Sequence, residues 1–138
     1  MLCLDLGTAR IGVAVSDPTG SVCTPLDALE RSAHGNILAR IAKLAAAEGV
    51  TRIVLGLPVT LEGRHGTKAA ESTRFRDDLI TATDIPVVLW DERLTTVEAV
   101  SRLKDAGARR SRDKGRVDSA AAAVLLESYL AALRRTSR

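Results

Sequence analysis

Four acidic residues occupy positions at which a carboxylate would be costly or could bind a ligand; they are Asp5, Asp91, Glu92 and Asp118. Asp5 interrupts the apolar segment Leu2–Leu6, where a charge is unfavourable unless a cation or hydrogen bonds compensate it. Gathered carboxylates repel one another, and a divalent cation removes that repulsion. Oxygen ligands without neighbouring Cys or His favour Mg²⁺ or Mn²⁺. Two such ions could activate a water and stabilise the leaving oxygen of a phosphodiester, so hydrolysis of a nucleic-acid backbone is the first hypothesis.

Each carboxylate also has a purely structural interpretation. Asp5 could form an Asx turn at a hairpin. Asp118 could be only the N-cap of the last helix. Glu92 could be a solvated residue at a strand end, and Asp91 beside it is a rival ligand that the spacing does not exclude.

The N-terminal part of the chain predicts three strands. Leu2–Leu6 and Ile11–Ser16 are short β-type segments on either side of residues 7–10, which is typical of a hairpin. Turn-forming residues at 17–20 precede a third segment at Ser21–Ala28. An antiparallel meander is therefore expected.

The rest of the chain alternates helical and strand patterns. A helix that ends at Gly49 is followed by a buried strand, a weaker helix, a second strand and two further helices. The two strands are expected at Arg52–Leu57 and Ile85–Trp90, and the weaker helix between them at Lys68–Ala82. Of the two further helices, one is capped by Thr95 and Glu98 and ends at Gly107, and the last covers Asp118–Arg134. This order predicts an α/β fold in which parallel crossover strands extend the meander. Because ligands bind at the carboxyl ends of parallel strands, the acidic residues are expected to meet there.

Basic residues are concentrated towards the C-terminus. Residues 101–138 contain 10 Lys and Arg against 4 Asp and Glu, whereas residues 1–100 contain 10 against 13. The densest stretch covers residues 108–116 and suits a polyphosphate partner, because each neutralised phosphate releases condensed counterions. The alternative is a solvated loop that only keeps the protein soluble.

Composition excludes several other classes. The 138 residues fit one ordinary domain, and 46% apolar with 27% charged residues indicates a folded protein. The longest purely apolar run, Ala120–Leu126, is far below the roughly 20 residues that cross a bilayer, so a cytoplasmic location and no membrane partner are expected. Phe75, Trp90 and Tyr129 are too few for a surface of stacked rings. Cys3 and Cys23 are expected to be small buried hydrophobic residues.

Four motifs, in chain order, resemble those of the YqgF/RuvX family of bacterial proteins. They are DLGTARIGVAVSD from Asp5, GLP at Gly56–Pro58, DERLTT at Asp91–Thr96 and KGRVDSAAA at Lys114–Ala122. The resemblance covers essentially the whole chain. It implies one RNase H-like domain over residues 1–138, with a five-stranded mixed sheet of order 3-2-1-4-5 flanked by helices.

The resemblance also implies a metal-dependent site formed by three carboxylates. Asp5, Glu92 and Asp118 are the residues expected to be catalytic and to bind Mg²⁺ or Mn²⁺ as a pair of ions, with Asp5 bridging them. Arg10, Lys114 and Arg116 are the candidates for contacts with substrate phosphates.

Three functions remain open at this point. The main hypothesis, implied by the resemblance, is a nuclease that processes the 5′ end of pre-16S rRNA in ribosome biogenesis. The alternatives are a Holliday junction resolvase acting on branched DNA and a non-catalytic module that binds RNA or DNA. DLGT also resembles a phosphate loop of actin-like ATPases, but those enzymes need a second, similar domain. A resolvase normally acts as a dimer, whereas an RNA-processing nuclease can act alone, so a monomer and a homodimer are both compatible with the sequence.

Overall fold

The computed structural model describes residues 1–7, 9–31, 36–58, 67–92 and 119–136. In these residues three strands come first, and helices and strands then alternate, as the sequence predicts. In chain order they are β1 (Leu2–Leu6), β2 (Arg10–Ser16), β3 (Cys23–Glu30), α1 (Ile37–Ala47), β4 (Ile53–Leu57), α2 (Thr67–Ala82), β5 (Val87–Asp91) and α5 (Ala120–Thr136). The helix predicted to begin near Thr95 lies outside the described residues.

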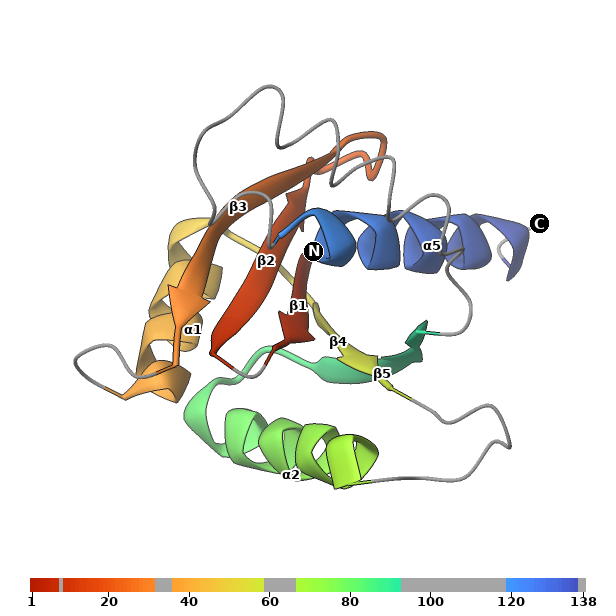
Figure 1. Cartoon of the computed structure of the whole chain (residues 1–138). Coiled ribbons are helices and arrows are strands. Elements are labelled where there is room, and N and C mark those ends of the chain that lie inside the picture. The colour runs from red at the N-terminus through yellow and green to blue at the C-terminus, as the bar shows by residue number, and fades with distance from the viewer. Residues whose placement is uncertain (8, 32–35, 59–66, 93–118, 137–138) are drawn as a thin grey trace.

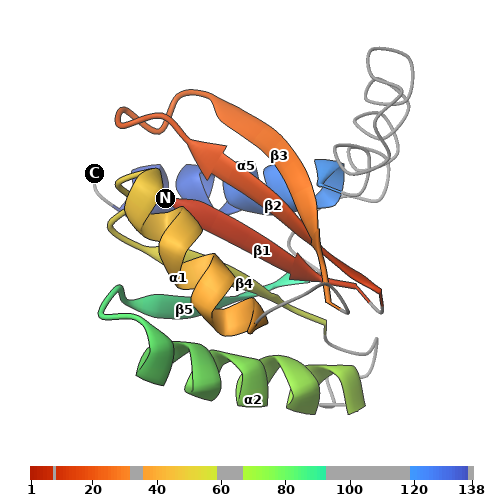
Figure 2. The same ribbon diagram turned by 90° about the vertical axis from the view of Figure 1, so that its left-hand side faces the viewer.

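The strands form one mixed sheet, which in the described residues has five strands in the order β3-β2-β1-β4-β5. β1 pairs antiparallel with β2, and β2 pairs antiparallel with β3. β1 pairs parallel with β4, and β4 with β5. The predicted order is therefore confirmed. The three parallel strands finish at the same end of the sheet, here called the carboxyl end; the opposite end is called the amino end (Figure 2).

Helices cover both faces of the sheet (Figure 1). One face packs against α1 and α2 through a core cluster that includes Leu4, Ile41 and Phe75. The other face packs against α5 through a second cluster that includes Cys3, Val54 and Leu126. Three layers result, with the sheet in the middle and α5 alone on its face among the described helices.

Helix α5 is built to lie close to the sheet. Its buried residues are Ala120, Ala122, Ala123, Val124, Leu125, Leu126, Tyr129 and Leu130. Small alanines in the first turns allow α5 to approach the sheet closely, and Tyr129 packs against the sheet further along the helix. The Tyr129 ring meets Trp90 of β5 edge to face at 5.2 Å, and its hydroxyl accepts a hydrogen bond from Arg52 at 2.7 Å.

Three predicted strands begin later than expected, and β4 differs by a single residue, since it begins at Ile53 rather than Arg52. The third strand begins at Cys23 rather than Ser21, because the Asp17 carboxylate accepts the N–H groups of Ser21 and Val22 and so holds these residues in a turn. β5 begins at Val87 rather than Ile85. Ile85 donates its N–H to Thr83 Oγ1 at 3.2 Å, and the proline that follows has no N–H to give to a strand ladder.

The structure tests the predicted burial of the two cysteines. Both cysteines are free thiols; Cys3 is fully buried, as predicted, whereas Cys23 is only half-buried. Within the described ranges, no helix has the length and apolar character needed to cross a membrane.

Candidate active site at the carboxyl end of the sheet

Asp5 lies near the carboxyl end of β1, on the face covered by α5. Side chains alternate along a strand. Leu2 and Leu4 belong to the cluster under α1 and α2, and Cys3 belongs to the cluster under α5, so Asp5 projects towards α5. Its neighbour across the antiparallel pair is Gly12 of β2, which adds no side chain beside the half-buried carboxylate.

Glu92 follows β5 and reaches back over β4. A Cβ placed on Gly56 of β4 would lie 2.8 Å from Glu92 Oε1 and 3.4 Å from Glu92 Cγ. The Glu92 carboxylate therefore occupies the space that a side chain at position 56 would take. Gly56 comes one residue after Leu55, the partner of Leu4, so Glu92 extends from the edge strand towards the strand that carries Asp5.

The rival ligand Asp91 has the opposite orientation in the strand. Trp90 packs in the α5 cluster and Leu89 packs against the α1 and α2 cluster. Alternation therefore directs Asp91 away from α5, to the face that does not carry Asp5. Of the two neighbouring acidic residues, Glu92 is the one that shares a face with Asp5.

The charges of both carboxylates affect the pKa of the buried thiol of Cys3. Burial raises the pKa of Cys3 well above its ordinary value of 9.0, and the negative charges of Asp5 and Glu92 raise that pKa further. Cys23 contributes in the same direction. Cys3 thus stays protonated at neutral pH, and the group available to a ligand on this face consists of oxygen atoms rather than a thiolate.

The start of α5 is fastened next to these carboxylates. The register of β2 and β3 shifts between Ile11 and Val13, an irregularity of the kind found beside many active sites. There the N–H of Val13 donates to Ser119 Oγ at 2.9 Å, a buried hydrogen bond between residues 106 positions apart. Figure 2 shows the first turn of α5 at the carboxyl end, where β1 and β5 finish.

Of the four remaining predicted site residues, the structure describes Arg10. Arg10 begins β2 at the carboxyl end and lies 4.0 Å from Glu30 in an ion pair. Lys114, Arg116 and Asp118 lie outside the described residues. Within the ranges that are described, no group of three or more His, Cys, Asp or Glu side chains could hold a metal ion. The structure thus brings together Asp5 and Glu92.

Three residues of this region had no role in the sequence analysis. Gly56 belonged only to a motif, yet its missing side chain leaves the space that Glu92 fills. Gly12 interrupts a β-type run, and a glycine inside a strand commonly marks a close approach. These glycines could have been found by that rule. The hydrogen bond of Ser119 could not, because it depends on a shift in strand register.

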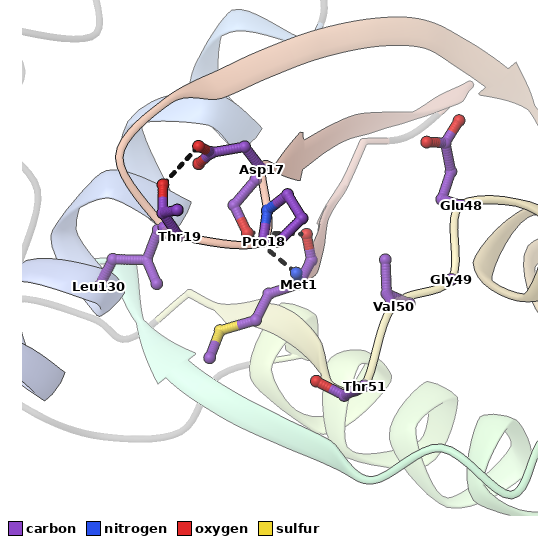
Figure 3. Close-up of a pocket in the computed structure, with 11 residues that line it drawn as sticks. Met1, Asp17, Pro18, Thr19, Glu48, Gly49, Val50, Thr51 and Leu130 are labelled. Atoms are coloured by element: carbon purple, nitrogen blue, oxygen red, sulfur yellow. Dashed lines mark hydrogen bonds between the residues drawn. The ribbon is translucent and has the colours of Figure 1, made fainter.

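A sizeable hollow lies at the other end of the sheet (Figure 3). It encloses about 340 Å³ between the loop that contains Asp17 and the loop that joins α1 to β4, with Leu130 of α5 at its side. Met1 precedes β1 and Thr51 precedes β4, so these lining residues belong to the amino end. This hollow contains neither Asp5 nor Glu92.

The mixed sheet of order 3-2-1-4-5, with an acidic residue on the first strand and another after the last, defines a protein of the RNase H-like class. Solved structures agree on the fold. RuvC of Thermus thermophilus superimposes with a TM-score of 0.62 at 14% identity, covering 99% of this chain and 98% of RuvC. The Holliday junction resolvase of Fowlpox virus, in complex with junction DNA, gives 0.55 at 12% identity, covering 96% and 99%.

Sequence comparison then gives the family. The model described as "RuvX: Holliday junction resolvase" matches residues 1–132, and the chain belongs to this family. A relative from Chloroflexus aggregans is 41% identical over 97% of this chain and 94% of its own length. One from Desulforudis audaxviator is 42% identical over 92% and 90%. Both carry the name "Putative pre-16S rRNA nuclease". Membership of this family confirms the predicted nuclease class.

Proposed function

We propose that this protein is a metal-dependent nuclease that hydrolyses phosphodiester bonds and processes the 5′ end of pre-16S rRNA in ribosome biogenesis. The observation that carries the proposal is the placement of Asp5 and Glu92 on one face at the carboxyl end of the sheet, with glycine beside each of them. The names of the relatives favour this RNA as the substrate. The family match over residues 1–132 supports treating the chain as a single nuclease domain.

The two carboxylates fit a hard divalent cation. They supply oxygen ligands, they stand on one face, and the nearest thiol, Cys3, is held in its neutral form. Mg²⁺ or Mn²⁺ matches that set of ligands, and we propose a pair of ions. When bound, such ions activate an attacking water and stabilise charge on the phosphate.

The residues of this chain then have distinct tasks. Asp5, on the central strand, and Glu92, beyond the end of β5, would hold the ions through their carboxylate oxygens. Asp118 is proposed as the third ligand, which is supported by its place in the chain directly before Ser119, whose hydroxyl is bonded to β2. Negative charge on this face also repels a phosphodiester unless cations are bound, which makes cleavage strictly dependent on metal.

Basic residues are proposed to hold the substrate. Arg10 begins β2 at the same end of the sheet as the carboxylates. Its ion pair with Glu30 is long and exposed, and pairs of this kind contribute little to stability, so exchange of Glu30 for a phosphate costs little. Lys114 and Arg116 are proposed to make further phosphate contacts. A partner of this kind places the protein in the cytoplasm, where pre-16S rRNA is processed.

One experiment tests the function. The purified protein is incubated with a 5′ fragment of pre-16S rRNA and, separately, with a four-way DNA junction, each with Mg²⁺, Mn²⁺ or EDTA. We expect products from the RNA only when metal is present, and none from the Asp5→Asn variant. Binding of RNA that persists in EDTA, with no cleavage under any condition, would instead identify a non-catalytic binding module.

A second candidate function is resolution of Holliday junctions. It is favoured by the TM-score of 0.62 with Thermus thermophilus RuvC, which has also been solved in complex with a Holliday junction substrate. A resolvase cuts two symmetry-related strands and therefore requires a dimer. Cleavage of the junction but not of the RNA, by a protein that sediments as a homodimer, would establish this function in place of RNA processing.

A further inference from the structure

We propose that Gly56 is a positioning residue: the absence of a side chain on this residue of β4 places the Glu92 carboxylate beside Asp5 and thereby sets the affinity of the site for divalent cations. The inference rests on the proposed role of Glu92 as a ligand. It assigns to Gly56 an effect on the site that is separate from the stability of the strand.

The space around Gly56 is filled from two sides. A Cβ at this position would lie 2.8 Å from Glu92 Oε1 and 3.0 Å from Leu125 Cδ1 of α5. Both distances are shorter than an ordinary van der Waals contact between such atoms. The position is therefore closed to any side chain unless both neighbours move.

The two neighbours differ in how easily they move. Leu125 is 3% exposed and belongs to the packed cluster between α5 and the sheet. Close-packed side chains resist displacement. The atom of Glu92 that meets the added Cβ is the end of a flexible side chain, on a residue that lies beyond the last residue of β5. A methyl group at position 56 would therefore displace the carboxylate much further than Leu125, which has to give way by only a few tenths of an ångström.

Backbone conformation does not explain the glycine. Among the described residues, the glycines with positive φ are Gly20 and Gly49. Gly56 has the extended conformation of a strand, which alanine adopts readily, and it pairs in register with Trp90 of β5. A glycine inside a strand without a conformational need marks a close approach of another group. Here the nearer of the two approaching groups is the carboxylate of Glu92.

The test measures cation binding and stability of Gly56→Ala in the absence of substrate. Titration with MnCl₂, followed by electron paramagnetic resonance, is expected to show Mn²⁺ affinity about 10–100-fold weaker than in the wild type, the range typical of residues that orient a metal ligand. The melting temperature is expected to fall only slightly, because Leu125 has to give way by only a few tenths of an ångström. Unfolding of Gly56→Ala would overturn the inference, because it would mean that the core and not Glu92 yields to the methyl group.

Gly49→Ala is the matched control. It adds the same methyl group at a position where nothing lies within 4 Å, but where φ is +64°. A side chain is strained in that conformation, so this variant is expected to lose stability and keep its Mn²⁺ affinity. Weaker Mn²⁺ binding in both glycine variants would point to a general effect and would overturn the assignment to Gly56.

A double-mutant cycle with Glu92→Gln separates this inference from the proposed function. If Gly56 acts through Glu92, Gly56→Ala should weaken Mn²⁺ binding in the wild type and have almost no further effect in Glu92→Gln. Equal effects in both backgrounds would overturn the positioning role. Weak binding in Glu92→Gln with normal binding in Gly56→Ala would also overturn it and leave the proposed function intact. Normal binding in both variants would remove Glu92 from the site.

Discussion

At the amino end of the sheet, the carboxylate of Asp17 accepts hydrogen bonds from the hydroxyl of Thr19 at 2.5 Å and from the N–H groups of Ser21 and Val22 at 2.7 and 2.9 Å. At the carboxyl end, Asp5 and Glu92 share one face, and their charges raise the pKa of the thiol of Cys3. The carboxylate of Asp17 stabilises a loop through its hydrogen bonds. The other two lie on one face, where we propose that they bind a cation.

The hollow and the proposed site lie at opposite ends of the sheet. The hollow of about 340 Å³ lies at the amino end, beside the carboxylate of Asp17, which is already engaged in hydrogen bonds (Figure 3). Asp5 and Glu92 lie at the carboxyl end, beside Gly12 and Gly56. The proposed site therefore rests on the types of side chain and their neighbours and not on empty volume.

The largest effect is expected from matched substitutions of one carboxylate at each end. Asp5→Asn should lower Mg²⁺-dependent cleavage of pre-16S rRNA by more than about 100-fold, exceeding the loss typical of residues that only orient a ligand. Asp17→Asn should retain nearly full activity, because Asp17 lies at the far end of the sheet. Initial rates at saturating Mg²⁺, with circular dichroism to confirm folding, measure both. Equal losses in the two variants would remove the functional distinction between the ends.

A smaller effect, on stability, is expected from the hydrogen bond that fastens α5 at the carboxyl end. Ser119→Ala leaves the N–H of Val13 buried without its acceptor, which should lower the free energy of unfolding by about 1–3 kcal/mol. Ser128→Ala is the control: Ser128 Oγ accepts from Trp90 Nε1 at 3.2 Å in a partly buried position. Urea denaturation measures both. A cost for Ser119→Ala no greater than that of the control would contradict the structural importance of this bond.

Alkaline pH tests the environment of Cys3. The pKa of Cys3 is raised in the folded state, chiefly by burial, so above the ordinary value of 9.0 the unfolded chain loses a proton that the native state keeps. Stability from this group is therefore complete below pH 9 and falls above it, by up to about 1.4 kcal/mol per pH unit. Urea unfolding between pH 8 and pH 11 should show a slope that is smaller in Cys3→Ala. An unchanged slope in that variant would show that Cys3 ionises normally in the fold.

Cys23 provides the comparison for that measurement. Burial raises the pKa of the half-buried Cys23 to about 11, so its contribution to the slope should extend from pH 9 to about pH 11 and then level off. Cys23→Ala should remove this limited part only. A larger change in Cys23→Ala than in Cys3→Ala would contradict the difference in burial between the two thiols.

The smallest effect is expected from Asp17 at acid pH. Its hydrogen bond from Thr19, followed by the N–H of Val22, lowers the pKa of the carboxyl group below its ordinary value of 3.8. A lowered pKa gives stability that is present above 3.8 and is lost as the pH falls through the native value. The melting temperature should therefore depend less on pH in Asp17→Asn than in the wild type between pH 5 and pH 2.5. Identical profiles would show that the loop does not depend on this charge.

Much of the fold follows from local patterns in the sequence. Alternating apolar residues in β1 and β2, and helical spacing in α1 and α5, are short-range signals that specify the elements and their buried faces. The boundaries that differ depend on contacts that a pattern does not contain. The turn that delays β3 depends on one carboxylate and two N–H groups, and the start of β5 depends on a proline.

The site was predictable in part. Asp5 stood out because a charge is unexpected in an apolar strand, and the structure places it on a face with Glu92. The choice between Asp91 and Glu92 could not be made from spacing, because it depends on which face of β5 packs under α5 and on the space above Gly56. The roles proposed for all six site residues stay predictions; they are Asp5, Arg10, Glu92, Lys114, Arg116 and Asp118.

The hydrogen bond between Val13 and Ser119 joins the second strand to the last helix across 106 positions of the chain. During synthesis on the ribosome, β1 and β2 emerge long before α5, and their α5-facing side stays uncovered until α5 has emerged. The surroundings of Asp5 are therefore completed only when α5 packs against the sheet. A nascent chain that has not yet reached α5 exposes the apolar residues of this face.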